Sequence, residues 1–407
     1  MRHSMKRSWA IIALLILLSG CTVHSTADTP DYTQVNDALT GDVTVWYLTG
    51  SSLLPDYEKL TAGVREGAKI TYRIFDTSDA LTDAWNQAKE SGSFPDLILT
   101  GYPWAYDLGE DITAQKLTDL TPYMDADVGY ERDSYYGAVM DAGVYNGAQY
   151  LFPVGFTVPM VYTSEERLIE YGLLVSERPS GMELVNALTE LAAKADRPTL
   201  AYMGNIAAAE LDACLSRAMG LTGASENDAL SVKLTLLLET MERELENYTY
   251  IRATPSEQLL DLTRNTCMSV MGLYNPPNLS RLQYSVYDAL GETLRMLPVA
   301  DWADGKTLHA LVTAYGFVPA DAKHPAASYR LLRALTDTAQ SFETYLPVSV
   351  RRTRVESMLA KLGVSDGKTM EGGLTYKAMG TENALWLQEL YAGISDAAVI
   401  SRIPDAD

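Results

Sequence analysis

Residues 145–162, YNGAQYLFPVGFTVPMVY, carry the pattern around which the predicted architecture is built. The stretch opens with Asn146-Gly147, the strongest short-range hairpin signal, between aromatic and apolar flanks. A strand is expected at 150–152 and is expected to stop at Pro153, because a strand that continued through Pro153 and Pro159 would lose ladder hydrogen bonds. A second short strand is expected at 160–162. Two strands joined through prolines and a glycine predict a passage of the chain between two lobes.

On the N-terminal side of this crossing, strands and helices alternate. Strands are expected at 43–47, 70–74 and 94–99, with a helix at 56–66 and another that Ser78 caps and Gly92 ends. This alternation predicts right-handed βαβ units and a mostly parallel sheet. Ligands of such sheets bind beyond the carboxyl ends of the strands. The loops at 48–52 and 100–106 are therefore expected at a binding site.

On the C-terminal side, helices outnumber strands. Ser180 and Glu183 form a capping-box pattern, and a long helical pattern covers 228–246. Strands are expected at 266–273, 294–298 and 311–319, the last of them broken by Gly316. A helix at 325–345 is expected to pack through Tyr329, Leu332 and Leu335, and the last fifty or so residues are expected to form two or three helices.

The composition is that of a globular protein with an acidic surface. The 407 residues are enough for two domains, and 47% are hydrophobic and 21% charged. The formal net charge is -21. Such a surface repels nucleic acid and anionic lipid headgroups, so neither is expected as a partner.

The N-terminus resembles an export signal. Basic residues at positions 2, 6 and 7 precede an apolar run at 9–18 that is too short to span a bilayer. The run ends in Leu18-Ser19-Gly20-Cys21, which resembles the bacterial lipobox, where a signal peptidase cuts before the cysteine and the thiol carries diacylglycerol. The alternative is an ordinary secretory signal with a chance cysteine. We expect a lipoprotein signal peptide at 1–20, a flexible tether at 21–40, and a lipid anchor at Cys21 on the extracytoplasmic face of the cell membrane.

Motifs for catalysis or metal binding are absent from the sequence. No Cys or His pair has zinc-ligand spacing, and there is no GxSxG, SxxK, P-loop or GxGxxG motif. Asp76, Asp79 and Asp83 lack the glycine and terminal glutamate of a calcium loop and are expected at a helix N-terminus. Cys214 and Cys267 are expected as buried free thiols, with a disulfide left open. No enzyme, cofactor or metal is expected.

Aromatic residues are the main positive feature. The chain has 25 Tyr and 6 Trp against 6 Phe, and tyrosine combines a flat apolar face with a hydroxyl that suits sugars and other polar ligands. Each residue taken singly is as well explained by a core or surface position, but several together fall at loop ends expected to face a cleft: Tyr47, Tyr102, Trp104, Tyr106, Phe156, Tyr274 and Tyr315.

Six motifs, in this order, resemble the family 1 extracellular solute-binding proteins of ABC importers, the maltose-binding-protein group. They are GSFPDLI at 92–98, LTDLTPY at 117–123, Asn146-Gly147 through Pro153, YGL at 171–173 with Pro179 and Glu183-Leu184, YGFV at 315–318, and LPV at 346–348. The chain departs from the family pattern at Thr163, at Gly181-Met182 and at Tyr274, where asparagine, Thr-Trp and tryptophan are usual.

The resemblance implies a two-lobed α/β fold like that of periplasmic binding proteins, in which each lobe is a mostly parallel sheet flanked by helices. The lobes would be 41–152 plus 308–348 and 153–307 plus 349–407. A solute would bind in the cleft between them, hinge closure would trap it, and the closed form would dock on the permease subunits of an ABC importer.

The expected function is therefore that of a monomeric lipid-anchored binding protein for a small polar solute, with carbohydrate favoured. The first alternative is the same fold used as a sensor or surface interaction lipoprotein without transport. The second is a surface hydrolase, against which the lack of a nucleophile–base motif argues. The residues expected to bind the solute are Tyr47, Thr49, Gly50, Ser51, Thr100, Gly101, Trp104, Phe156, Tyr274 and Tyr315.

Overall fold

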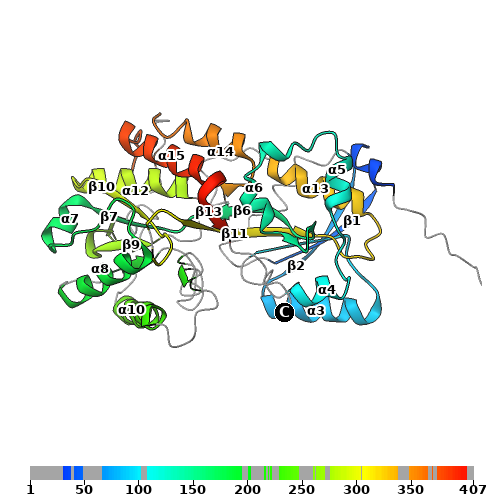
Figure 1. Ribbon diagram of the computed structural model, residues 1–407, viewed down its shortest axis with the longest axis horizontal. Helices are drawn as coiled ribbons and strands as arrows, with labels where there is room; N and C mark the ends of the chain where they lie inside the picture. Colours follow the sequence, from blue (N-terminus) through cyan, green and yellow to red (C-terminus); the bar gives the residue numbers. More distant parts are fainter. Residues whose placement is uncertain are drawn as a thin grey trace, which may run out of the picture.

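The computed structural model is a mixed α/β structure with two sheets flanked by helices (Figure 1). The first sheet has the strand order β12-β6-β11-β3-β1-β2, with β13 paired to β11, and the second has the order β10-β7-β9-β8. The structure describes residues 31–37, 41–48, 67–101, 108–194, 200–202, 215–216, 219, 221, 229–246, 260–261, 263–270, 276–303, 305–337, 348–364, 369 and 374–400. The helix expected at 56–66 lies outside these residues.

The described N-terminal strands and the helix α3 follow one another in the predicted order. Strands β1 (Asp42–Leu48), β2 (Lys69–Phe75) and β3 (Leu97–Gly101) run parallel, with β1 in the middle. Helix α3 (Ser78–Ser91) ends at Gly92, whose φ of 69° is the left-handed conformation that glycine adopts easily. The N-cap was predicted one residue too late, because the side chain of Thr77 accepts the hydrogen bond from the Ala80 N–H.

The hairpin and the passage into the second sheet are confirmed, but the strand expected at 150–152 is not, because residues 150 and 151 lie in no strand and the strand begins at Phe152. Strands β4 (Val144–Tyr145) and β5 (Ala148–Gln149) form the predicted hairpin, and Asn146 and Gly147 both have positive φ. Strand β6 (Phe152–Thr157), however, runs through Pro153. Strand β12 (Val348–Ser349) pairs with β6 only at Gly155 and Phe156, so the missing N–H of Pro153 costs no bond of that ladder.

Past Pro159 the chain enters the second sheet. Strand β7 (Met160–Ser164) pairs antiparallel with β10 (Leu294–Pro298) and β9 (Met268–Val270), and β8 (Leu200–Tyr202) pairs parallel with β9. The chain returns to the first sheet along β11 (Leu308–Phe317), antiparallel to both β3 and β6. The expectation of mostly parallel sheets thus holds for β2-β1-β3 but not at the crossing, where β11 pairs antiparallel with β3 and β6, and β7 pairs antiparallel with β9 and β10.

Gly316 does not break β11, contrary to expectation. A Cβ at this position would lie 2.0 Å from Cδ2 of Leu332 in α13 (Pro325–Asp337), so the glycine allows the helix to approach the strand closely. The predicted packing of α13 is confirmed, since Tyr329, Leu332 and Leu335 are buried.

The remaining elements cover the sheets. The Ser180 hydroxyl caps α8 (Gly181–Lys194) by accepting from the Glu183 N–H at 3.2 Å, whereas the Glu183 carboxylate binds Ser176 instead of completing the capping box. Strand β13 (Ala398–Ile400), which was not predicted, pairs parallel with β11. The other helices are α4 (Gly109–Thr113), α5 (Thr121–Ala126), α6 (Gly137–Asp141), α7 (Glu165–Glu170), α10 (Ala229–Glu246), α12 (Pro276–Leu290), α14 (Arg352–Leu359) and α15 (Thr381–Ala397), with 3-10 helices η1 (Tyr32–Asn36) and η3 (Arg132–Ser134).

The end of the expected tether packs on the folded body. Within 21–40, Val35 of η1 is 1% exposed, and the ring of Tyr32 meets that of Tyr123 at 4.9 Å. The Asn36 side chain donates to the Ala126 carbonyl at 2.8 Å and accepts from the Val128 N–H at 3.1 Å. Residues 32–36 are therefore part of the first lobe rather than of a flexible tether.

Cys267 is a buried free thiol, whereas Cys214 and Cys21 lie outside the described residues. None of the described helices has the length and apolar composition needed to cross a membrane.

Candidate functional site

The candidate site lies where β3 ends beside the returning strand β11. Thr100 pairs with Tyr315, and Gly101 pairs with Ala314, in the antiparallel register of these two strands. Three residues predicted from the sequence, Thr100, Gly101 and Tyr315, are thereby brought together. Neighbouring residues of paired strands place their side chains on the same face of the sheet, so the Thr100 and Tyr315 side chains lie side by side.

Both side chains belong to the face that α3 covers. Phe317, two residues beyond Tyr315, lies on the same face, and its ring meets that of Trp85 of α3 at 5.6 Å. Tyr47 lies on the other face, because it pairs with Leu99, which in turn pairs with Gly316. The Tyr47 ring packs edge-on against Tyr72 at 5.7 Å and is 5% exposed.

Phe156 also points away from Thr100 and Tyr315. Its ring lies 5.2 Å from Tyr136 of α6 and 6.2 Å from Tyr391 of α15, and it is fully buried. Helices α6 and α15 lie on the side of the sheet opposite α3 (Figure 1). Phe156 is therefore a core residue of that side and does not join the other predicted residues.

Sequence reasoning passed over Thr157, which follows Phe156 at the end of β6. Because successive side chains of a strand alternate, Thr157 points to the opposite face from Phe156, which is the α3 face. It is fully buried and is the last residue of β6 before the crossing. The signal that could have found it is the alternation in VGFT at 154–157, in which a polar residue takes the position next to an aromatic core residue.

Two buried hydroxyls near Tyr315 in the strands have no hydrogen-bond partner within the described part of the chain. Thr100, the strand partner of Tyr315, and Thr313, two residues before Tyr315, are both fully buried, and neither Oγ1 atom has a partner among the described residues. An unsatisfied buried hydroxyl costs about 1–3 kcal/mol, and most buried polar groups are satisfied. We call Thr100, Gly101, Thr157, Thr313 and Tyr315 the strand-end group.

The strand-end group consists of neutral side chains and backbone groups. Its members offer hydroxyls, backbone groups and one aromatic ring, with no carboxylate, imidazole or thiol among them. Within the described ranges, no cluster of three or more His, Cys, Asp or Glu residues could hold a metal ion. The other predicted contacts lie outside the described residues: Thr49, Gly50, Ser51, Trp104 and Tyr274.

Solved structures with the same α/β fold are two-lobed binding proteins. The sugar-binding protein MalE from Xanthomonas citri aligns at a TM-score of 0.57 and 12% identity, over 89% of this chain and 87% of that one. The galacto-N-biose-/lacto-N-biose I-binding protein from Bifidobacterium longum aligns at 0.55 and 15%, over 90% and 88%. An ABC transporter solute-binding protein from Thermotoga lettingae, bound with α-D-tagatose, aligns at 0.51 and 13%, over 78% and 84%.

Residues 51–341 match the family described as bacterial extracellular solute-binding protein, and the chain belongs to this family. The comparison with curated proteins gives no match. The family resemblance and the two-lobed fold expected from the six sequence motifs are thereby confirmed, and the family is one of binding proteins rather than enzymes.

Proposed function

We propose that this protein captures a small carbohydrate between its lobes and delivers it to the permease of an ABC importer. Its family is that of extracellular solute-binding proteins, and proteins of the same fold bind lacto-N-biose and tagatose. The observation that carries the proposal is the pair of hydroxyls that are unsatisfied among the described residues, those of Thr100, the strand partner of Tyr315, and of Thr313, two residues before Tyr315.

A carbohydrate matches this chemistry. Each sugar hydroxyl both donates and accepts, so it can satisfy a threonine hydroxyl in either direction, while its ring packs against an aromatic face. The strand-end group holds no charged side chain to favour an ionic solute. Thr49, Gly50, Ser51, Trp104 and Tyr274 are proposed to complete the site from the neighbouring loops, with the solute enclosed when the lobes close.

The protein is proposed to act as a monomer, held on the extracytoplasmic face of the membrane by lipid on Cys21 after removal of residues 1–20. The lipobox-like Leu18-Ser19-Gly20-Cys21 supports this anchor. Replacement of Cys21 by alanine is expected to move the protein from the membrane fraction to the soluble fraction. Retention of the variant in the membrane fraction would contradict a lipid anchor at this residue.

The deciding experiment is a thermal-shift screen of the mature protein lacking Cys21 against sugars, oligosaccharides, peptides, polyamines and metal ions. A ligand at about 100 times its dissociation constant adds about 2.7 kcal/mol to the stability, which gives a readable shift. A carbohydrate hit that is lost in Trp104→Ala would support the proposal. If a solute of another class stabilises the protein instead, that class and not carbohydrate is the ligand.

The absence of any hit from folded protein would favour the alternative, a sensor or interaction lipoprotein. The departures from the family pattern at Thr163, Gly181-Met182 and Tyr274 are the observations that motivate this alternative. A sugar that stabilises the protein but whose uptake by cells does not depend on it would also favour sensing over transport.

A further inference from the structure

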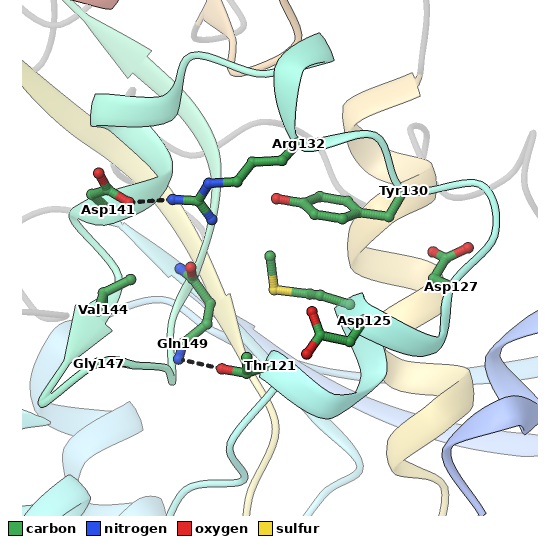
Figure 2. A pocket seen from close by; sticks show the side chains of 10 residues that line it. Thr121, Asp125, Asp127, Tyr130, Arg132, Asp141, Val144, Gly147 and Gln149 are labelled. Atoms are coloured by element: carbon green, nitrogen blue, oxygen red, sulfur yellow. Dashed lines mark hydrogen bonds and ion pairs between the residues drawn. The ribbon is translucent and has the colours of Figure 1, made fainter.

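A pocket lies on the opposite side of the first sheet from the strand-end group. It has a volume of about 470 Å³ and is enclosed by α5, the loop that contains η3, and the β4–β5 hairpin (Figure 2). One of its lining residues, Asp127, accepts hydrogen bonds from Tyr329 and Arg333 of α13. Helix α13 packs on the face of the sheet away from α3, so this pocket is separate from the proposed sugar site.

A buried acceptor without a partner lies in the wall of this pocket. Gln149 is 3% exposed, and its amide nitrogen donates to the carbonyls of Met140 at 2.9 Å and Leu151 at 2.6 Å. Because carbonyl oxygens only accept, these two bonds fix which end of the amide is the NH₂ group. The Oε1 atom is left without a hydrogen-bond partner. Figure 2 shows the Gln149 side chain extending into the pocket toward Arg132.

The backbone holds Gln149 in this position. Its N–H donates to the Thr121 hydroxyl at 2.9 Å, and its carbonyl accepts from the Leu120 N–H at 2.7 Å. The residue is therefore tied to α5 as well as to α6 and cannot turn its amide away without breaking several bonds. An unsatisfied acceptor held this firmly is unfavourable unless a donor reaches it.

The pocket has more carboxylates than cations to pair with them. Asp127 already accepts from Gly129 N at 2.8 Å, Arg333 at 2.6 Å and Tyr329 at 3.0 Å. Arg132, the arginine in the pocket wall, is paired with Asp141. Within the described part of the chain, no cation pairs with the exposed carboxylate of Asp125, which also lines the pocket.

The Gln149 amide and the Arg132 guanidinium, by contrast, are already paired, and the Tyr130 hydroxyl, which has no hydrogen-bond partner among the described residues, can accept a hydrogen bond as well as donate one. Both hydrogens of the Gln149 amide are used, and the guanidinium of Arg132 faces a carboxylate. Burial raises the pKa of Tyr130 to about 12 against the opposing effect of Arg132, so its ring lines the pocket as a neutral phenol. A ligand that only donates hydrogen bonds and carries positive charge fits these groups better than one that needs donors in return.

We infer that this pocket is a second ligand site, which binds a small organic cation with primary ammonium groups. One ammonium donates to Gln149 Oε1, and the other pairs with Asp125 at the mouth. The alkyl chain between them lies against Met124 and the face of Tyr130, where an ammonium also gains from the aromatic ring.

The test is a calorimetric titration of the purified protein with 1,4-diaminobutane, with 1,4-butanediol as an uncharged probe of the same length. Saturable binding of one equivalent with a dissociation constant below about 1 mM is expected for the diamine, and no binding is expected for the diol. Absence of diamine binding, or equal binding of the diol, would overturn the inference.

Three variants place the binding in this pocket. Asp125→Asn, at an exposed position that the fold does not need, is expected to weaken the diamine about threefold to tenfold, since it removes a charge-assisted hydrogen bond. Asp133→Asn, at an exposed acid of η3 outside the pocket, is the matched control and should leave the affinity unchanged.

Gln149→Met should weaken diamine binding at least about tenfold. If this variant does not fold, the comparison of Asp125→Asn with its control decides. Equal effects of Asp125→Asn and Asp133→Asn would show general charge attraction and overturn the site.

Discussion

Thr100 of β3 and Tyr315 of β11 are direct partners in an antiparallel pair, although 215 positions separate them in the sequence. Both are fully buried, and the Thr100 hydroxyl has no hydrogen-bond partner among the residues that the structure describes. The pairing joins the carboxyl end of a parallel βα unit to the strand that returns from the second sheet. A ligand at this place would contact two segments that the strand pairing already holds in a fixed relation.

Thr100→Val tests whether the unsatisfied hydroxyl serves the solute. Valine keeps the shape and removes a polar group that makes no bond in the protein, so the free energy of unfolding should stay the same or rise by up to about 1 kcal/mol. Solute affinity, measured by calorimetry, should fall about tenfold. The control is Thr163→Val, whose hydroxyl donates to the Cys267 carbonyl at 3.1 Å. It should lose about 1 kcal/mol of stability and keep its affinity.

Asp127→Asn should destabilise the first lobe. The carboxylate is 1% exposed and bridges the end of α5 to Arg333 of α13, whose side chain is 22% exposed. Asparagine has one acceptor oxygen for three donors and leaves the arginine without its counter-charge. We expect the free energy of unfolding, measured with urea, to fall by about 2–3 kcal/mol. This is at or below the lower end of what breaking a fully buried ion pair costs, because Arg333 reaches water. Asp125→Asn, at the exposed neighbour, should change stability by less than about 0.5 kcal/mol; an equal loss in both variants would contradict the bridging role.

Gly143→Ala should be strongly destabilising, whereas Gly393→Ala should not. A Cβ on Gly143 would lie 1.9 Å from the Leu151 carbonyl oxygen, which is backbone and cannot move aside. We expect a loss of about 1–3 kcal/mol or more. Gly393 is inside α15 with nothing within 4 Å of the added atom, so alanine there should add about 0.5–1 kcal/mol through helix propensity. Thermal unfolding of the two variants, measured side by side, checks that Gly143→Ala lowers the stability and Gly393→Ala raises it.

The lowered pKa of Glu166 predicts that the stability of the protein falls slightly at acidic pH. Burial raises its pKa, but hydrogen bonds from Thr293 and Ser164 outweigh burial and hold the pKa below its usual value. A lowered folded-state pKa means that Glu166 contributes stability above its unfolded pKa and loses it as the pH falls through the folded value. Glu166→Gln should therefore be less stable than the parent at pH 7, by less than about 1 kcal/mol because the site is exposed. The difference should shrink as the pH falls below the unfolded pKa of about 4.3 and vanish below the lower folded-state pKa; a difference that is constant with pH would contradict the assignment.

Local signals predicted the local features well. The Asn146-Gly147 hairpin, the end of α3 at Gly92 and the buried face of α13 depend on backbone preferences and side-chain periodicity within one short segment. The features missed were those that a partner segment determines. Strand β6 tolerates Pro153 because β12 is short, and Gly316 sits inside β11 because Leu332 packs there.

In the candidate site too, some residues were predicted from local sequence and others depend on contacts with distant segments. Sequence reasoning found Thr100, Gly101 and Tyr315, because strand ends of a parallel sheet are recognisable binding positions. It chose Phe156 over Thr157, because an aromatic residue near a crossing resembles a ligand contact until the face of the strand is known. The contacts of Phe156 with α6 and α15 decide that face, and no pattern within β6 contains them.

By itself, the sequence determined the class of protein, the order of the N-terminal βα units and the point at which the chain passes from one sheet to the other. These follow from residue types and spacings that act over a few positions. The tertiary structure alone decided which strand ends meet, which hydroxyls are left without partners and which side chains turn toward helix α3. Those relations depend on pairings between segments that lie far apart in the sequence. The free energy gained when these segments are buried against one another is a property of the assembled sheet and not of any one segment.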